Sequence, residues 1–98
     1  MPIRDEPEVV DRLQRTLQTF RKAQGLLLTA HRRVKGLPAA DAEQFWMAQG
    51  NRIEQHLHAT AVEVVASFRT FSAAGLVASA DGRHLVNEAQ RHLAEGGR

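Results

Sequence analysis

The sequence has no cysteine and no tyrosine among its 98 residues, and it contains a single tryptophan. Without cysteine the chain can form neither a disulfide framework nor a thiolate metal site, and it has no cysteine nucleophile. No apolar run is long enough to span a bilayer, and the charged N-terminal stretch lacks the apolar segment of a secretory signal. We therefore expect a soluble, cytoplasmic protein, the alternative being secretion without a conventional signal peptide.

An excess of charge of one sign is also missing, because the formal net charge is +2 with 24% charged residues. A balance so close to neutral gives no argument for binding to nucleic acid or to an anionic membrane. With 43% hydrophobic residues, the composition is that of one globular domain, which we place over residues 1–98.

Motifs for catalysis are absent too. Ser67, Ser72 and Ser79 are not set in a glycine-rich nucleophile elbow, and no stretch has the spacing of a phosphate-binding loop. We predict a protein that is not an enzyme and that holds no cofactor.

What the sequence does contain is a long helical pattern in its first third. Asp5 and Glu8 match a capping box and predict a helix that begins near residue 6. The helix should end at Lys35, where Gly36 can take the left-handed conformation. Its apolar and semi-apolar residues alternate at steps of three and four, as in the seam of a coiled coil. This seam consists of Val10, Leu13, Leu17, Phe20, Gln24, Leu27, His31 and Val34.

A second helix is predicted over residues 39–73, after a connection short enough to place it antiparallel to the first. Its N-cap is Asp41, unless Pro38 starts the helix earlier. We expect a kink or break at Gly50–Asn51 and a stop at Gly75. Its apolar face is broader than the seam, so we expect a third helix or a second chain to cover it. That face consists of Phe45, Trp46, Ile53, Leu57, Ala61, Val64, Phe68 and Phe71.

The segment 76–86 has two interpretations. Asp81 and Gly82 suit a tight turn between two strands. The alternative is a loop followed by a third helix over about 81–94, capped by Ser79 or Asp81. We favour the helix, because an isolated hairpin is marginally stable and the chain offers it no further strand. The predicted fold is all-α: an antiparallel hairpin of two long helices plus a short C-terminal third helix, completed as a bundle by oligomerisation.

Two polar residues of the seam and three large residues near the bend are candidates for an interface. Gln24 either fixes the register of associating helices or lies at the edge of the seam. His31 is a half-exposed structural residue or, if buried, an acid-sensitive one. Three consecutive large residues at 45–47 cannot all face one core, so one of them contacts a partner or they pack on two sides. The predicted interface consists of Val10, Leu13, Leu17, Phe20, Gln24, Leu27, His31, Phe45, Trp46 and Met47.

Five histidines raise the possibility of a metal site. His84, Glu88 and His92 lie four residues apart along one helix, and Glu54 and His58 repeat that step in the second helix. The spacings of carboxylate-bridged metal bundles and zinc proteases do not occur. We therefore predict no metal site and keep His84, Glu88 and His92 as the candidates.

A short basic run ends the first helix at residues 31–35. Arg32, Arg33 and Lys35 complement the negative end of the helix dipole, which explains the run without a ligand. A nucleic-acid interface normally has a wider basic face with aromatic stacking groups. We do not expect nucleic acid to be a partner.

The length, the two long antiparallel helices and Trp46 near the bend resemble the Trp-x-Gly family, small helical hairpins exported by bacterial type VII systems. Ala48 stands where the family motif has glycine, and without tyrosine the chain lacks the family's C-terminal export signal. We do not assign the chain to this family. The resemblance implies a secreted hairpin that forms a homo- or heterodimer.

These observations together predict a protein that acts by association with itself or with another helical protein, as an adaptor, chaperone or regulatory subunit. The alternatives are a secreted hairpin of the kind just described and a helical bundle that binds a metal or another ligand.

Overall fold

The computed structural model describes residues 2–96, with side chains described for residues 7–95. The chain forms helices α1 (Pro2–Lys35), α2 (Ala39–Phe45), α3 (Asn51–Ala73) and α4 (Ala80–Gly96), and a π-helical turn, Trp46–Gly50, joins α2 to α3. No strand occurs between residues 2 and 96, so the all-α prediction is confirmed for this range. Completion of the bundle by a second copy stays a prediction.

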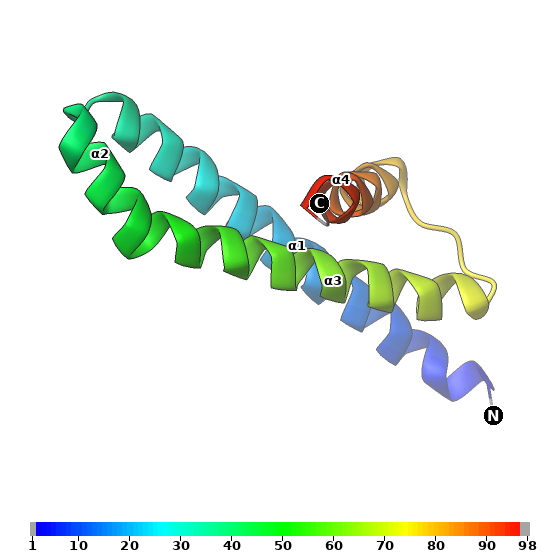
Figure 1. The fold of residues 1–98 in the computed structure, drawn as a ribbon. Coiled ribbons are helices and arrows are strands. Elements are labelled where there is room, and N and C mark those ends of the chain that lie inside the picture. The colour runs from blue at the N-terminus through cyan, green and yellow to red at the C-terminus, as the bar shows by residue number, and fades with distance from the viewer. Residues whose placement is uncertain (1, 97–98) are drawn as a thin grey trace.

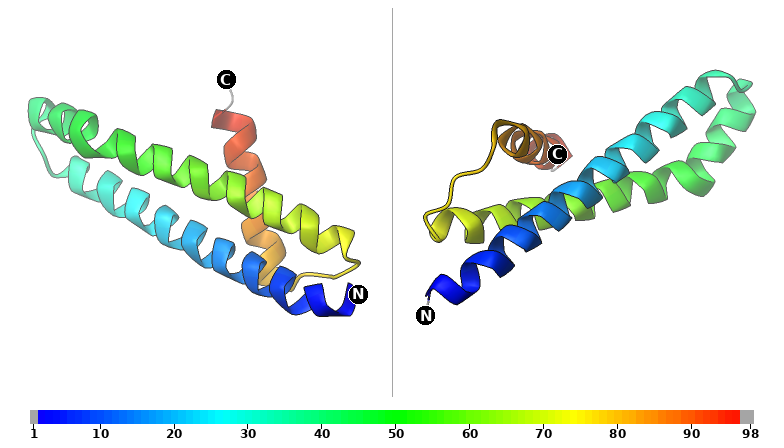
Figure 2. Two further views of the ribbon diagram at one scale, coloured as in Figure 1. Left: turned by 90° about the horizontal axis from the view of Figure 1, so that it is seen from below. Right: turned by 180° about the vertical axis from the view of Figure 1, so that it is seen from behind.

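The helices form an elongated molecule of 58 × 23 × 21 Å. Helices α1 and α3 run antiparallel and pack side by side, as the short connection 36–38 between α1 and α2 predicts (Figure 1). Helix α4 crosses one side of this hairpin at a steep angle, near its middle (Figure 2). The hairpin therefore has one face covered by α4 and one face that α4 leaves open.

Helix α1 begins at Pro2, earlier than the predicted start near residue 6. Proline suits the first helical position because its missing N–H would have no partner there. Asp5 consequently lies inside the helix and not at its N-cap, so the capping-box prediction was wrong; its side chain lies outside the described range. Pro7 also lies inside α1, where it cannot donate to the carbonyl four residues earlier.

The end of α1 at Lys35 agrees with the prediction, but Gly36 does not adopt the left-handed conformation. The N–H groups of Gly36 and Leu37 instead donate to the carbonyls of Arg33 and Val34, at 3.2 and 3.1 Å. These bonds over three residues tighten the last turn and satisfy two of its carbonyls. The left-handed residue predicted here was therefore unnecessary.

The second arm of the hairpin is a continuous helical rod that runs from Ala39 through the π-helical turn to Ala73. Pro38 precedes it and accepts a hydrogen bond from the Ala42 N–H at 2.9 Å. The earlier of the two predicted starts is therefore the observed one, and Asp41 lies in the first turn. Of the kink or break predicted at Gly50–Asn51, the kink is observed: the chain changes direction at the wider π-helical turn Trp46–Gly50 and continues as a helix without a break (Figure 1).

Gly75 ends α3 as predicted, with a positive φ of 80°. The N–H of Leu76 donates to the Phe71 carbonyl at 3.4 Å, and the N–H of Gly75 donates to the Ser72 carbonyl at 2.9 Å. This pair of bonds is the Schellman motif, which satisfies the last carbonyls of a helix and requires a residue that tolerates positive φ.

The segment after Gly75 confirms the helical interpretation of residues 76–86. Ser79 caps α4, since its hydroxyl oxygen accepts a hydrogen bond from the Gly82 N–H at 3.1 Å. Asp81 and Gly82 lie in the first turn of α4 and do not form the turn of a hairpin. The acidic Asp81 also complements the positive end of the helix dipole.

The core lies where the three long helices meet. Its buried residues are Phe20 and Ala23 of α1, Leu57, Ala61 and Val64 of α3, and Val86 and Ala89 of α4. Each helix thus places one alanine, fully buried, in this cluster. An alanine at a helix contact lets the neighbouring backbone approach closely, and larger apolar side chains then fill the space around it.

Away from this cluster, α1 and α3 are joined by a polar contact. Ser67 is 1% exposed, and its hydroxyl oxygen lies 2.7 Å from that of Thr16. One hydroxyl donates to the other, and the second donates to a carbonyl of its own helix, either Leu13 or Glu63. The buried hydroxyl of Ser67 and the half-buried hydroxyl of Thr16 are therefore both satisfied.

The Ser67 contact gives a first prediction. Ser67→Leu should lower the free energy of unfolding by about 2 kcal/mol or more, because the larger side chain overfills the contact between α1 and α3. Urea denaturation followed by circular dichroism measures the change. Ser72→Leu is the matched control, since Ser72 is exposed on the same helix. Equal losses in the two variants would contradict the packing described for Ser67.

Candidate functional site

The seam of α1 packs within the chain. Leu13 and Phe20 are buried, and Leu17 and Leu27 are half-buried against the core. The seam therefore faces α3 and α4, and contact with a second chain would require these helices to separate. Association of two chains through this seam stays a prediction.

Gln24 occupies a position that neither sequence interpretation anticipated. Its side-chain amide donates to a carboxylate oxygen of Glu88 on α4. The other oxygen of Glu88 lies 2.6 Å from Nε2 of His84, one helical turn earlier. Gln24 thus links α1 to α4 in the same chain. The half-buried Glu88 carboxylate is the shared partner of Gln24 and His84.

The contact between Gln24 and Glu88 gives a second prediction. Gln24→Ala should lower the free energy of unfolding by about 1 kcal/mol, because it removes a partner from a half-buried carboxylate. Gln18→Ala, an exposed glutamine on the same helix, has the same change in helix propensity and serves as control. Chemical denaturation measures both. A loss no larger in Gln24→Ala than in Gln18→Ala would show that the contact contributes nothing to stability.

The predicted metal candidates do not come together. His84 pairs with Glu88, while His92 lies against His58 of α3, with the two ring centroids 5.8 Å apart. Eight residues of helix separate His84 from His92 by about 12 Å, which is too far for one ion. Among the side chains that the structure describes, residues 7–95, no three histidine or acidic groups form a ready-made metal cluster. The trio His84, Glu88 and His92 is therefore wrong as a single site.

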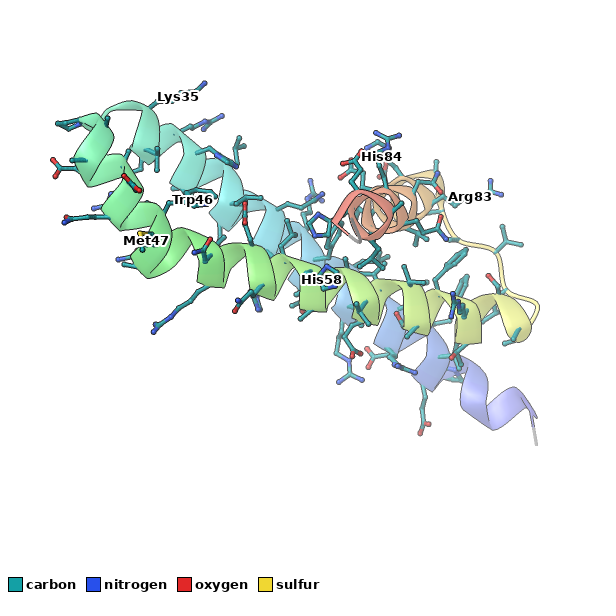
Figure 3. All side chains as sticks on the ribbon, in the orientation of Figure 1. Lys35, Trp46, Met47, His58, Arg83 and His84 are labelled. Atoms are coloured by element: carbon teal, nitrogen blue, oxygen red, sulfur yellow. The ribbon has the colours of Figure 1, made fainter. Side chains whose placement is uncertain are left out.

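At the tip of the hairpin, Trp46 packs between the two long helices (Figure 3). Its ring lies on His31 of α1, with centroids 4.9 Å apart and planes inclined by 30°. The indole also covers Gly50, where an added Cβ would overlap it. The π-helical turn thus needs glycine at this position for the tryptophan to reach α1.

The residues on either side of Trp46 differ in their surroundings. Phe45 is half-buried, and the guanidinium carbon of Arg33 lies 5.7 Å from its ring centroid, a cation–π contact. Met47 is 71% exposed. The basic run at the end of α1 therefore lies beside the aromatic rings of the hairpin tip. The sequence analysis did not predict this contact, although the short connection 36–38 already places the end of α1 opposite α2. Contact of Met47 with a partner stays a prediction.

The packing of Trp46 on Gly50 gives a third prediction. Gly50→Ala should shift the tryptophan emission to longer wavelength, because the added methyl group displaces the indole from His31 into water. The measurement is local, since Trp46 is the single tryptophan and the chain has no tyrosine. Gly25→Ala is the control, because a Cβ there meets no atom within 4 Å. Unchanged emission in Gly50→Ala would contradict the indole position.

On the face that α4 leaves open, a groove of 340 Å³ runs between α1 and α3. The left panel of Figure 2 is seen from this side, with α4 behind the hairpin. Arg12 of α1 and Glu63 of α3 approach within 3.9 Å across it. The groove is lined by Arg12, Arg15, Thr16, Thr19, His56, Ala59, Thr60 and Glu63. Sequence reasoning missed this groove because these residues flank the apolar pattern.

In comparisons with protein-family models, curated proteins and solved structures, none matched the chain. The likeness to the Trp-x-Gly hairpins therefore remains a resemblance in length, hairpin and the place of Trp46. Over the described residues, none of the helices combines the length and the apolar character that crossing a membrane requires.

Proposed function

We propose that the protein is a non-enzymatic association module that pairs with a second copy through the groove between α1 and α3. The observation that carries this proposal is the one-sided cover of the hairpin. Helix α4 packs on one face, whereas the opposite face presents a groove. Half of the residues that line it have short side chains, namely Thr16, Thr19, Ala59 and Thr60, and the others are Arg12, Arg15, His56 and Glu63. Short side chains let a further helix approach a helix pair closely.

The charges around the groove favour a second copy over an unrelated partner. A two-fold interface brings the same surface together twice, so that surface must complement itself. Arg12 and Arg15 lie on the α1 side of the groove, and Glu63 lies on the α3 side. When the groove faces are opposed about a two-fold axis that runs parallel to the helices, α1 of each copy lies over α3 of the other. Arg12 of each copy then faces Glu63 of the other.

Pairing in this way would place four long helices around a common core, as in a four-helix bundle. It would leave α4 and the hairpin tip of each copy on the outside. The exposed Met47 at each tip is then available to a further helical protein, in keeping with an adaptor or regulatory subunit.

A fourth prediction tests the pairing. The unaltered chain should sediment as a dimer at micromolar concentration. Ala59→Arg should raise the dimer dissociation constant about 100-fold or more, because it places a long charged side chain in an interface that already holds Arg12 and Arg15, at a cost of about 3 kcal/mol. Ala73→Arg adds the same charge at an exposed position of the same helix, outside the groove, and should leave the dimer intact.

A charge exchange identifies the contact. Arg12→Glu and Glu63→Arg should each weaken self-association, since each places like charges opposite one another. Mixing the two variants should restore a dimer that contains one chain of each kind. A monomeric unaltered chain, or a dimer indifferent to Ala59→Arg, would refute the proposal.

A further inference from the structure

We propose that His58 and His92, together with Glu54 and Glu95, bind a divalent transition-metal ion of the zinc class between α3 and α4. This site differs from the one considered in the sequence, because it joins two helices through one histidine from each. It lies within a single chain and does not depend on the proposed pairing.

The separation of the two imidazole rings carries the inference. Their centroids are 5.8 Å apart, and their planes are inclined by 58°. Zinc binds histidine nitrogen at about 2.0–2.1 Å, so two imidazoles on one tetrahedral ion have ring centres roughly 5 Å apart. A small rotation of either side chain would therefore bring both rings onto one ion. Figure 3 shows His58 on α3 beneath the end of α4, with His84 on the far side of that helix.

Two carboxylates are placed to complete the coordination. Glu54 precedes His58 by one turn of α3, and Glu95 follows His92 by one turn of α4, so each acid shares a helix face with its histidine. All four side chains line one groove of 560 Å³. As the side chains stand, no three of the described ligand-type groups enclose an ion, but both glutamates are exposed and have the reach to turn inward.

The chemistry of this ligand set selects the class of metal. Imidazole nitrogen suits zinc, nickel and copper, whereas magnesium and calcium prefer sites made of oxygen alone. Two nitrogens and one or two carboxylate oxygens, with water in any open position, match zinc. His84 is less suited to take part, because its Nε2 already contacts Glu88.

Such an ion would hold α4 to α3. Because it would bind the folded chain and not the unfolded one, binding must stabilise the fold. The consequence is largest for α4, which is joined to α3 by the six-residue connection 74–79 and packs mainly on α3, with less contact to α1. The site would thus fix the helix that completes the core.

A fifth prediction tests the site with zinc chloride as the probe and the full chain as the sample. Zinc in large excess should raise the thermal unfolding midpoint by about 5 °C or more. His58→Ala should abolish this shift, and because His58 is exposed, the variant should fold normally without metal. His92→Gln should abolish it too. Glu54→Gln combined with Glu95→Gln should weaken zinc binding measured by calorimetry.

Two other histidines serve as controls. His56 lies on the opposite flank of α3, and His84 lies on the far side of α4. The variants His56→Ala and His84→Ala should therefore both retain the full shift of the unfolding midpoint by zinc. The shift should not depend on protein concentration, which separates this test from that of pairing. No zinc effect on the unaltered chain, or an equal effect in His58→Ala, would overturn the proposal. Loss of the effect in His84→Ala would also overturn it.

Discussion

The fold depends on one buried cluster to which three helices each contribute a fully buried alanine. Ala23, Ala61 and Ala89 belong to α1, α3 and α4, and none of the three side chains is exposed. Because these side chains are so short, Phe20 and Val64 can occupy the space around them without separating the helices. A larger residue at any of the three positions would push one helix away and expose the others. The contact is therefore shared by the whole core.

The sequence predicts the helices well because a helix is specified by the spacing of residues that are close together in the chain. The alternation at three and four residues identifies both rods, and Gly75 marks the end of α3 as the structure has it. The boundaries at Pro2 and Gly36 were less predictable. A capping motif at Asp5 competes there with a proline suited to the first turn, and a tightened turn replaces the left-handed glycine.

What lies across a helix face is harder to predict, because periodicity shows that a face is covered and not what covers it. The seam of α1 has the pattern of a coiled coil between chains, yet α3 and α4 of the same chain cover it. The Gln24 contact with Glu88 spans 64 residues, and its recognition requires α4 to be placed first. The same holds for His58 and His92, which the crossing of α3 by α4 brings together.

The open groove and the hairpin tip show a related limit. Thr19 and Ala59 are individually unremarkable in sequence, since short polar and small residues flank most amphipathic helices. Their common position becomes evident once α1 and α3 are packed together. At the tip, the short connection places the end of α1 opposite α2, which the sequence predicts. The π-helical turn then brings Trp46 against His31, which it does not.

The positive φ of Gly75 has a consequence for the path that leads to α4. A third helix can cross a two-helix hairpin on either side, and the two arrangements are mirror-related in topology. The apolar side chains of Phe20 and Val64 make one face of this hairpin the side that α4 covers. The left-handed turn at Gly75 ends α3, and the four residues 76–79 then carry the chain to that face. A substitution at Gly75 would therefore strain the path of α4 to the core as well as the end of one helix.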